Sequence, residues 1–158
     1  GRGSETQCYE LAAGALRDRS ALRTFAEMIR AQGGDGRVAK EPDRLAKAPF
    51  CREVKAEESG YVAHMDTEAC GIASVLLKAG RSTKDDVIDP AAGIVLKKKY
   101  GDAVAKGETL ACLYASDEAL FAQAEQTLRR AYRLEPARPA ARRWIYARVS
   151  REGTQRFE

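Results

Sequence analysis

The spacing of hydrophobic residues changes along the chain, and this change constrains the fold more than any other feature. Before residue 33, apolar residues recur every three or four positions, as in amphipathic helices. After residue 50 they alternate over short runs, which is typical of strands. The stretch 33–50 between them holds three glycines and two prolines, which break both patterns. The sequence therefore predicts a helical segment over 1–32, a linker over 33–50 and a strand-rich module over 51–158.

Two helices are expected in the first segment. Ser4 is placed to cap a helix that ends near Arg17, and a second helix runs from Ser20 to the glycines at 33 and 34. The second helix carries an apolar stripe, so it needs another helix or a sheet to pack against.

The module after the linker is predicted to mix strands with helices. Strands are expected over 51–56, 61–65, 93–96 and 109–114 with a short one at Val104, helices over 67–79 and 117–134, and a last strand over 142–149. Short strands joined by glycine turns predict a small, highly curved antiparallel barrel or sandwich. The fold class is therefore α+β, with one helix interrupting the strands.

Composition excludes some classes of protein and permits others. Hydrophobic residues make up 44% and charged residues 32%, which supplies a core and argues against a disordered chain. The net charge of +4 permits a nucleic-acid partner without demanding one. We expect no membrane span, because no apolar run approaches the roughly 18 residues that one requires. The chain starts without Met, so we expect a fragment or a processed product.

Several residues are candidates for chemical roles. The four cysteines form no CxxC pair, so reduced and mostly buried thiols are expected. His64 is the only histidine and is expected to be a half-buried strand residue. Asp85, Asp86 and Asp89 could hold a divalent cation, but they lack the spacing of a calcium loop, so capping and solvation are the favoured roles. The loop that begins at Gly80 is more suggestive, because Arg81 and Lys84 could swing over an anionic ligand.

The last third of the chain is basic and aromatic, which is the pattern that favours nucleic acid or an acidic partner. The residues are Lys97, Lys98, Lys99, Arg129, Arg130, Arg133, Arg138, Arg142, Arg143 and Arg148, with Tyr132, Trp144 and Tyr146 among them. The arginines are spread over a helix, a turn and a strand, however, so the favoured interpretation is a solvated face with a packed Trp144. A stand-alone module that binds RNA or an acidic protein therefore remains a second hypothesis.

Three stretches together resemble one known family. They are AQGGD at 31–35, GYV at 60–62 and the run 76–115, which contains AGR-x-TK-x-D, IDP-x-x-GIVL and KGE-x-L. In these residues the sequence resembles the C-terminal part of the pyrimidine-nucleoside phosphorylases, which include the thymidine phosphorylases. It departs from the family at Lys78, where Gly is usual, at Lys97, where His is frequent, and at Gly36, where Pro is common.

The resemblance implies that the parent enzyme, a glycosyltransferase of nucleotide salvage, converts a pyrimidine nucleoside and phosphate into the base and a pentose 1-phosphate. It also implies a cytoplasmic homodimer whose phosphate- and base-binding residues lie upstream. We therefore expect this chain alone to be inactive, with no catalytic residue, cofactor or metal, and a nucleic-acid partner is not expected. The implied fold is an α/β hammerhead (barrel-sandwich-like) domain that packs on an adjacent α/β domain, to which the helices of 1–32 belong. Arg81 and Lys84 are then candidates for closing the active-site cleft.

Overall fold

The computed structural model describes residues 2–157, which divide into two compact units. The first unit extends to Lys47 and the second begins at Ala48. No helix within the described range is both long enough and apolar enough to cross a membrane.

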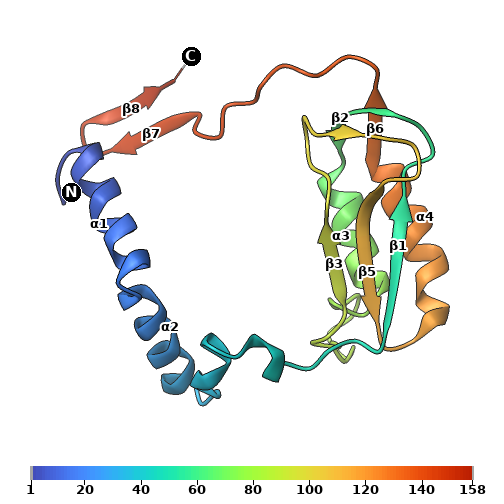
Figure 1. Cartoon of the computed structure of the whole chain (residues 1–158), viewed down its shortest axis with the longest axis horizontal. Coiled ribbons are helices and arrows are strands. Elements are labelled where there is room, and N and C mark those ends of the chain that lie inside the picture. Colours follow the sequence, from blue (N-terminus) through green and yellow to red (C-terminus); the bar gives the residue numbers. More distant parts are fainter. Residues whose placement is uncertain (1, 158) are drawn as a thin grey trace. The chain divides into compact units, whose positions relative to one another are not determined.

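The first unit is helical. It consists of α1 (Glu5–Arg17), α2 (Ser20–Ala31) and the short 3₁₀ turns η1 (Gly36–Ala39) and η2 (Pro42–Arg44) (Figure 1). Ser4 caps α1 in a reciprocal capping box: its hydroxyl accepts from the Gln7 amide at 3.3 Å, and its own amide donates to Oε1 of Gln7 at 2.9 Å. Both helices predicted from the periodicity are confirmed.

The helices of the first unit bury little apolar surface. Ala26 is the one buried apolar residue in the described part of this unit, and Tyr9 and Leu16 are each 74% exposed. Phe25 on α2 is 48% exposed, although it belongs to the expected apolar stripe. The unit therefore has two formed helices without a hydrophobic core of its own.

The second unit contains two three-stranded antiparallel sheets. One has the order β1–β5–β3 and the other the order β4–β2–β6, so β1 and β2 belong to different sheets although they are consecutive. The elements are β1 (Phe50–Lys55), β2 (Gly60–Met65), α3 (Thr67–Leu76), β3 (Gly93–Leu96), β4 (Ala103–Val104), β5 (Thr109–Ala115), η3 (Glu118–Leu120), α4 (Phe121–Ala131), β6 (Tyr132–Glu135), β7 (Ala147–Ser150) and β8 (Gly153–Arg156). The predicted α+β class is confirmed.

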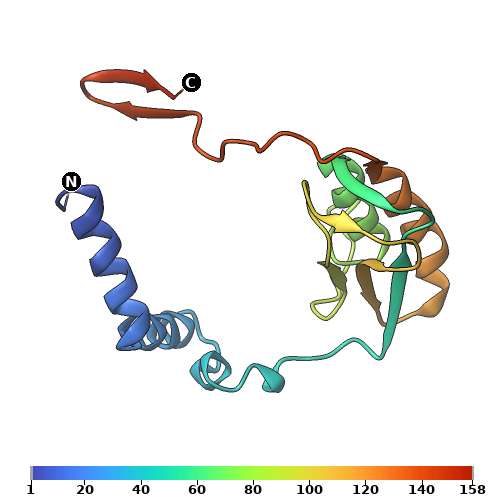
Figure 2. The ribbon, with the colours of Figure 1, turned by 45° about the horizontal axis from the view of Figure 1, so that its top comes forward.

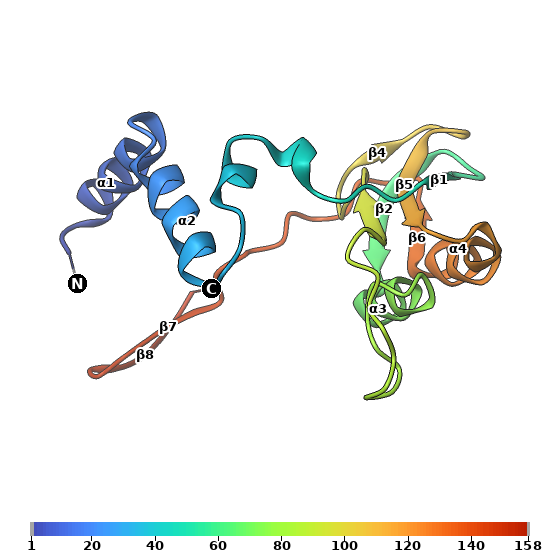
Figure 3. The same cartoon turned by 90° about the horizontal axis from the view of Figure 1, so that it is seen from below.

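Two hydrophobic clusters hold this unit together. Helices α3 and α4 lie side by side against the β1–β5–β3 sheet (Figure 3), and the larger cluster joins Phe121 of α4 to Leu113 of β5. The smaller cluster joins Val62 of β2 to Leu110 of β5. Because β5 contributes to both clusters, it connects the two sheets through the core.

The end of α4 differs from the prediction. The helix expected over 117–134 begins as a 3₁₀ turn and ends at Ala131, and Tyr132–Glu135 forms β6 against β2. The Tyr132 hydroxyl donates to the Lys98 carbonyl at 2.9 Å, and Leu134 packs on the smaller cluster. Pairing with a distant strand therefore overrides the local helical pattern.

The C-terminal region also differs from the prediction. The strand expected over 142–149 is shorter and later, since β7 covers Ala147–Ser150, and its partner β8 was not predicted. The chain between β6 and β7 forms no helix or strand over 136–146. The two strands make a separate ribbon at the end of this extended stretch (Figure 2).

Candidate functional site

The loop that contains Arg81 and Lys84 starts where α3 stops. The amide of Lys78 donates to the Val75 carbonyl at 2.8 Å, and the amide of Ala79 donates to the Ser74 carbonyl at 3.1 Å. This is the Schellman arrangement, in which the residue at the Lys78 position takes a left-handed backbone conformation. Lys78 has a φ of 66°, a conformation that favours glycine. The helix predicted to reach residue 79 therefore ends at Leu76.

Asp89 closes the base of this loop. Its amide donates to the Lys78 carbonyl at 2.9 Å, so the two ends of the loop meet. Its carboxylate accepts from the Ser116 hydroxyl at 2.6 Å and from the Ala91 amide at 2.9 Å. These bonds, led by that of Ser116, lower the pKa of Asp89 below its usual value. The loop is thereby fixed to the end of β5, next to Ser116.

Asp86 organises the tip of the loop. Its carboxylate accepts from the Thr83 hydroxyl at 2.7 Å, from the Thr83 amide at 3.0 Å and from the Ser82 amide at 2.8 Å. The bonds from Thr83 make the largest contribution to lowering its pKa. Asp86 and Asp89 thus both serve as acceptors for the loop itself, whereas helix capping was the role favoured from the sequence, and Asp85 is exposed.

Arg81 and Lys84 are both exposed on this braced loop. Neither takes part in an ion pair within residues 2–157. The loop borders an open hollow of about 520 Å³, whose lining includes Lys78, Ser82 and Val87. The arrangement presents two cationic side chains to solvent on a loop whose backbone is held at its base and at its tip.

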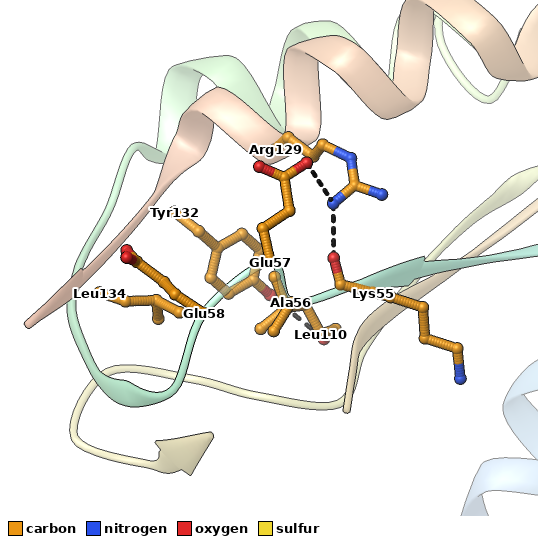
Figure 4. Close-up of a pocket in the computed structure, with 8 residues that line it drawn as sticks. All are labelled: Lys55, Ala56, Glu57, Glu58, Leu110, Arg129, Tyr132 and Leu134. Atoms are coloured by element: carbon orange, nitrogen blue, oxygen red, sulfur yellow. Dashed lines mark hydrogen bonds and ion pairs between the residues drawn. The ribbon is translucent and has the colours of Figure 1, made fainter. Parts of the chain in front are cut away.

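A second hollow, of about 290 Å³, lies between α4 and the strands (Figure 4). Arg129 projects from α4 into it and forms ion pairs with Glu125 at 2.7 Å and with Glu57 at 3.3 Å. Its guanidinium also donates to the Lys55 carbonyl, and Tyr132 lies in the same wall. Burial raises the pKa of Tyr132. The guanidinium of Arg129 already has carboxylate partners, so it is not free to bind an anionic ligand. This hollow is therefore a structural junction between α4 and β1.

Other residues singled out from the sequence lie apart from the loop. His64 is exposed on β2, where a half-buried position was expected. Mostly buried thiols were also a wrong prediction, since Cys8 and Cys51 are exposed, Cys70 is half-buried and Cys112 is buried. Trp144 was expected to pack and is instead 88% exposed, because it lies in the extended stretch before β7.

The basic residues of the last third are divided among several structural roles. Arg129 is paired as described, Arg133 pairs with Glu135 at 3.4 Å, and Lys98 pairs with Glu108 at 2.6 Å. The Arg142 guanidinium stacks on the ring of Tyr100, 3.8 Å from its centroid. Several of these cations therefore already have partners within the unit.

Sequence reasoning missed the residues that fix the loop. The sequence indicates Asp89 only as a metal ligand or a cap and indicates no role for Ser116, because their bond joins residues 27 positions apart. The IDP motif was the available signal, since it places an acidic residue just before β3.

Comparison with known proteins points to one family. Residues 61–135 match the model of the pyrimidine nucleoside phosphorylase C-terminal domain. The pyrimidine-nucleoside phosphorylase of Geobacillus stearothermophilus is 47% identical over 104 residues, which are 66% of this chain and 24% of the relative. The Bacillus subtilis enzyme of the same name is 43% identical over 103 residues, and that of Staphylococcus aureus is 45% identical over 102 residues. Each of these two alignments covers 65% of this chain and 24% of the relative.

The chain thus spans about a quarter of the length of the curated relatives it matches. The matched segment contains the whole α3–β3 loop, with Arg81, Lys84 and Asp89, as well as α4 with Arg129. The resemblance inferred from the motifs is confirmed by these matches. Residues 61–135 belong to the family of pyrimidine nucleoside phosphorylase C-terminal domains.

Proposed function

We propose that this chain is the C-terminal part of a pyrimidine-nucleoside phosphorylase and acts as its non-catalytic domain. The observation that carries the proposal is the family match over 61–135 together with relatives of which the chain spans 24%. The parent reaction is attack of phosphate on a pyrimidine nucleoside, which gives the base and a pentose 1-phosphate. The groups that bind phosphate and base belong to the part of the enzyme outside this chain, which by itself is inactive.

The domain boundaries follow from the same proposal. Helices within 1–32 belong to a neighbouring α/β domain, 33–50 is the linker, and 51–158 is an α/β hammerhead domain. The exposure of Tyr9 and Leu16 supports this division, because such side chains need a partner to cover them. The position of α3 between β2 and β3 supports the hammerhead arrangement, in which a helix interrupts the strands.

The α3–β3 loop is the part of this domain that we assign to cleft closure. Closing an active site over phosphate requires cations that face the anion without first breaking ion pairs. Arg81 and Lys84 meet this requirement within residues 2–157, since both are exposed and unpaired there. Asp86 and Asp89 keep the loop backbone ordered, so little conformational entropy is lost when it docks. The parent enzyme would work as a cytoplasmic homodimer.

The test uses the full-length protein. We expect it to release base from uridine or thymidine only when inorganic phosphate is present, whereas the 158-residue chain releases none. Failure of the full-length protein to do so would reject the proposed function. In that protein, Arg81→Ala and Lys84→Ala should each lower kcat/KM, and Lys106→Ala, an exposed lysine on another turn, is the matched control. Unchanged kcat and KM in the first two variants would reject the role in closure.

A further inference from the structure

The ribbon of β7 and β8 has two open edges. The strands pair only with each other among the described residues, with Ala147 opposite Arg156 and Ser150 opposite Gly153. An isolated two-stranded hairpin is only marginally stable in water. Unpaired strand edges are also ready sites for another strand to add. The ribbon therefore lacks the neighbours that normally stabilise such an element.

The register identifies the backbone groups that are free at these edges. The Phe157 amide donates to the Tyr146 carbonyl at 3.0 Å, which makes these two residues a hydrogen-bonded pair. Hydrogen-bonded and non-hydrogen-bonded pairs alternate along an antiparallel ladder. The next pair, Ala147 and Arg156, is therefore non-hydrogen-bonded. Val149 and Thr154, two pairs further along, are non-hydrogen-bonded as well. Ala147 and Val149 thus point their amides outward from β7, and Thr154 and Arg156 point theirs outward from β8.

Val149 of β7 and three large apolar residues just before the strand are exposed. Ile145 and Tyr146 are each 68% exposed, Val149 is 78% exposed, and Trp144 is 88% exposed. Tyr146 is hydrogen-bonded to Phe157 directly before β7, so alternation sends Val149 to one face of the ribbon and Tyr146 to the other. Strand β8 offers fewer apolar groups, since it reads Gly-Thr-Gln-Arg. A partner that covers β7 would bury apolar surface on both faces.

The ribbon and the residues leading into it are strongly basic. Residues 142–157 contain five arginines and one glutamate, at positions 142, 143, 148, 151, 156 and 152. A second copy of the ribbon would bring like charges together, which opposes self-pairing. A receiving surface that carries carboxylates would be attracted to it.

We propose that the outer edge of β7 docks by strand addition on a sheet in the N-terminal part of the same polypeptide, at an edge flanked by carboxylates. The inference rests on the proposed function, which places about three quarters of the protein's length before the region matched here. The extended stretch 136–146 supplies a tether, since eleven residues span up to about 36 Å. Main-chain hydrogen bonds from Ala147 and Val149 then give affinity, and the apolar side chains are covered on both faces.

Single-stranded RNA is a poorer occupant. Phosphates would suit the arginines, and bases would stack on Trp144 and Tyr146. RNA would leave the edge amides of Ala147 and Val149 without the regular acceptors that a strand provides, and it would not cover Ile145. A protein strand accounts for the free amides, the apolar side chains and the charge together.

Hydrogen exchange at single amides in the full-length protein and in the 158-residue chain tests this proposal. We expect the Ala147 and Val149 amides to exchange at nearly unprotected rates in the short chain and at least about 100-fold more slowly in the full-length protein. Equal rates in the two proteins would overturn the proposal. Protection in the short chain that grows with its concentration would assign the edge to a second copy, and protection that requires added single-stranded RNA would assign it to nucleic acid; either result would overturn it as well.

A pair of proline variants of the full-length protein identifies the edge. Val149→Pro removes an outward amide of β7, and Thr154→Pro removes the facing outward amide of β8, so the two changes place matched strain on the ribbon. We expect the Ala147 amide to lose its protection in Val149→Pro and to keep it in Thr154→Pro. The reverse result would overturn the assignment to β7. Nucleoside phosphorolysis is assayed separately on the unaltered protein, so loss of the proposed function and loss of the docking inference can be told apart.

Discussion

The two units differ in what holds them together. In the second unit, α3, α4 and two sheets share a core in which Phe121, Leu113 and Val54 are almost fully buried. In the first unit, α1 and α2 are well formed and α1 is capped, yet Ala26 is the one buried apolar residue among those described. Local signals are therefore enough to specify a helix, whereas a cooperative domain also requires a partner for its apolar face. The comparison predicts that the cooperative unfolding transition measured for this chain is that of the second unit.

The largest expected effect comes from the core of the second unit. Phe121→Ala should lower the free energy of unfolding by about 3–5 kcal/mol, since it removes a ring that is 1% exposed. Phe25→Ala on α2, where the ring is 48% exposed, should change it by less than about 0.5 kcal/mol. Urea unfolding of both variants, followed by circular dichroism, checks this contrast. Similar losses in the two variants would show that the first unit has a cooperative core after all.

A partly buried hydroxyl should have the next largest effect. Tyr132→Phe removes the donor to the carbonyls of Lys98 and Leu110, so it should cost about 1–2 kcal/mol of unfolding free energy. Tyr9→Phe is the matched change in the first unit, where the ring is 74% exposed, and should have no measurable effect. The same urea titration measures both. No loss in Tyr132→Phe would mean that water replaces the hydroxyl at this junction.

Within residues 2–157, each unit contains one non-glycine residue with a left-handed backbone. Lys78 has a φ of 66° at the end of α3, and Arg19 has a φ of 60° before α2. Lys78→Gly should raise the unfolding free energy by about 0.5–1 kcal/mol, because the relief of strain exceeds the added freedom of the unfolded chain. Arg19→Gly should leave the measured unfolding transition unchanged, because α1 and α2 are not part of the cooperative transition of the second unit. A stabilisation by Arg19→Gly equal to that by Lys78→Gly would contradict the comparison.

The elements that could be predicted from the sequence are those with local signals. Periodicity, caps and glycine turns predict the bounds of α1, β2 and β3. The AGR-x-TK-x-D motif predicts the loop with Arg81 and Lys84. The end of α4 could not be predicted, since residues 132–135 continue a helical pattern and become a strand only by pairing with β2, about 70 residues earlier. Strand β8 was missed because Gly-Thr-Gln-Arg has no alternation of apolar and polar residues.

The candidate site shows the same limit. Its cationic residues are visible in the sequence, but the bond from Ser116 to Asp89 exists only when β5 and the α3–β3 loop are brought together. No spacing rule links these two positions. Sequence reasoning thus finds the residues that a loop presents and misses the contacts that fix its position.

The smallest expected effect distinguishes two carboxylates by their response to pH and salt. The pKa of Asp89 is lowered mainly by the Ser116 hydroxyl, and that of Asp35 in the first unit mainly by the Arg37 guanidinium. A carboxyl whose folded pKa is depressed stabilises the fold above its ordinary pKa, near 3.8, and that stabilisation is lost as the pH falls through the lowered value. Below pH 4, exchange at the Ala91 amide should therefore become faster relative to its intrinsic rate as Asp89 is protonated.

Salt separates the two carboxylates, because ions screen a solvent-exposed ion pair more than a bond to a neutral hydroxyl. In 1 M NaCl the titration of Asp35, followed by carboxyl NMR shifts, should move toward its ordinary pKa, while that of Asp89 stays nearly in place. Asp89→Asn should speed exchange at Ala91 at pH 7 without altering exchange at Arg37, whose amide bonds to Asp35. An equal salt response at both carboxylates would mean that the charges of the α3–β3 loop, and not the bond from Ser116, hold it in place.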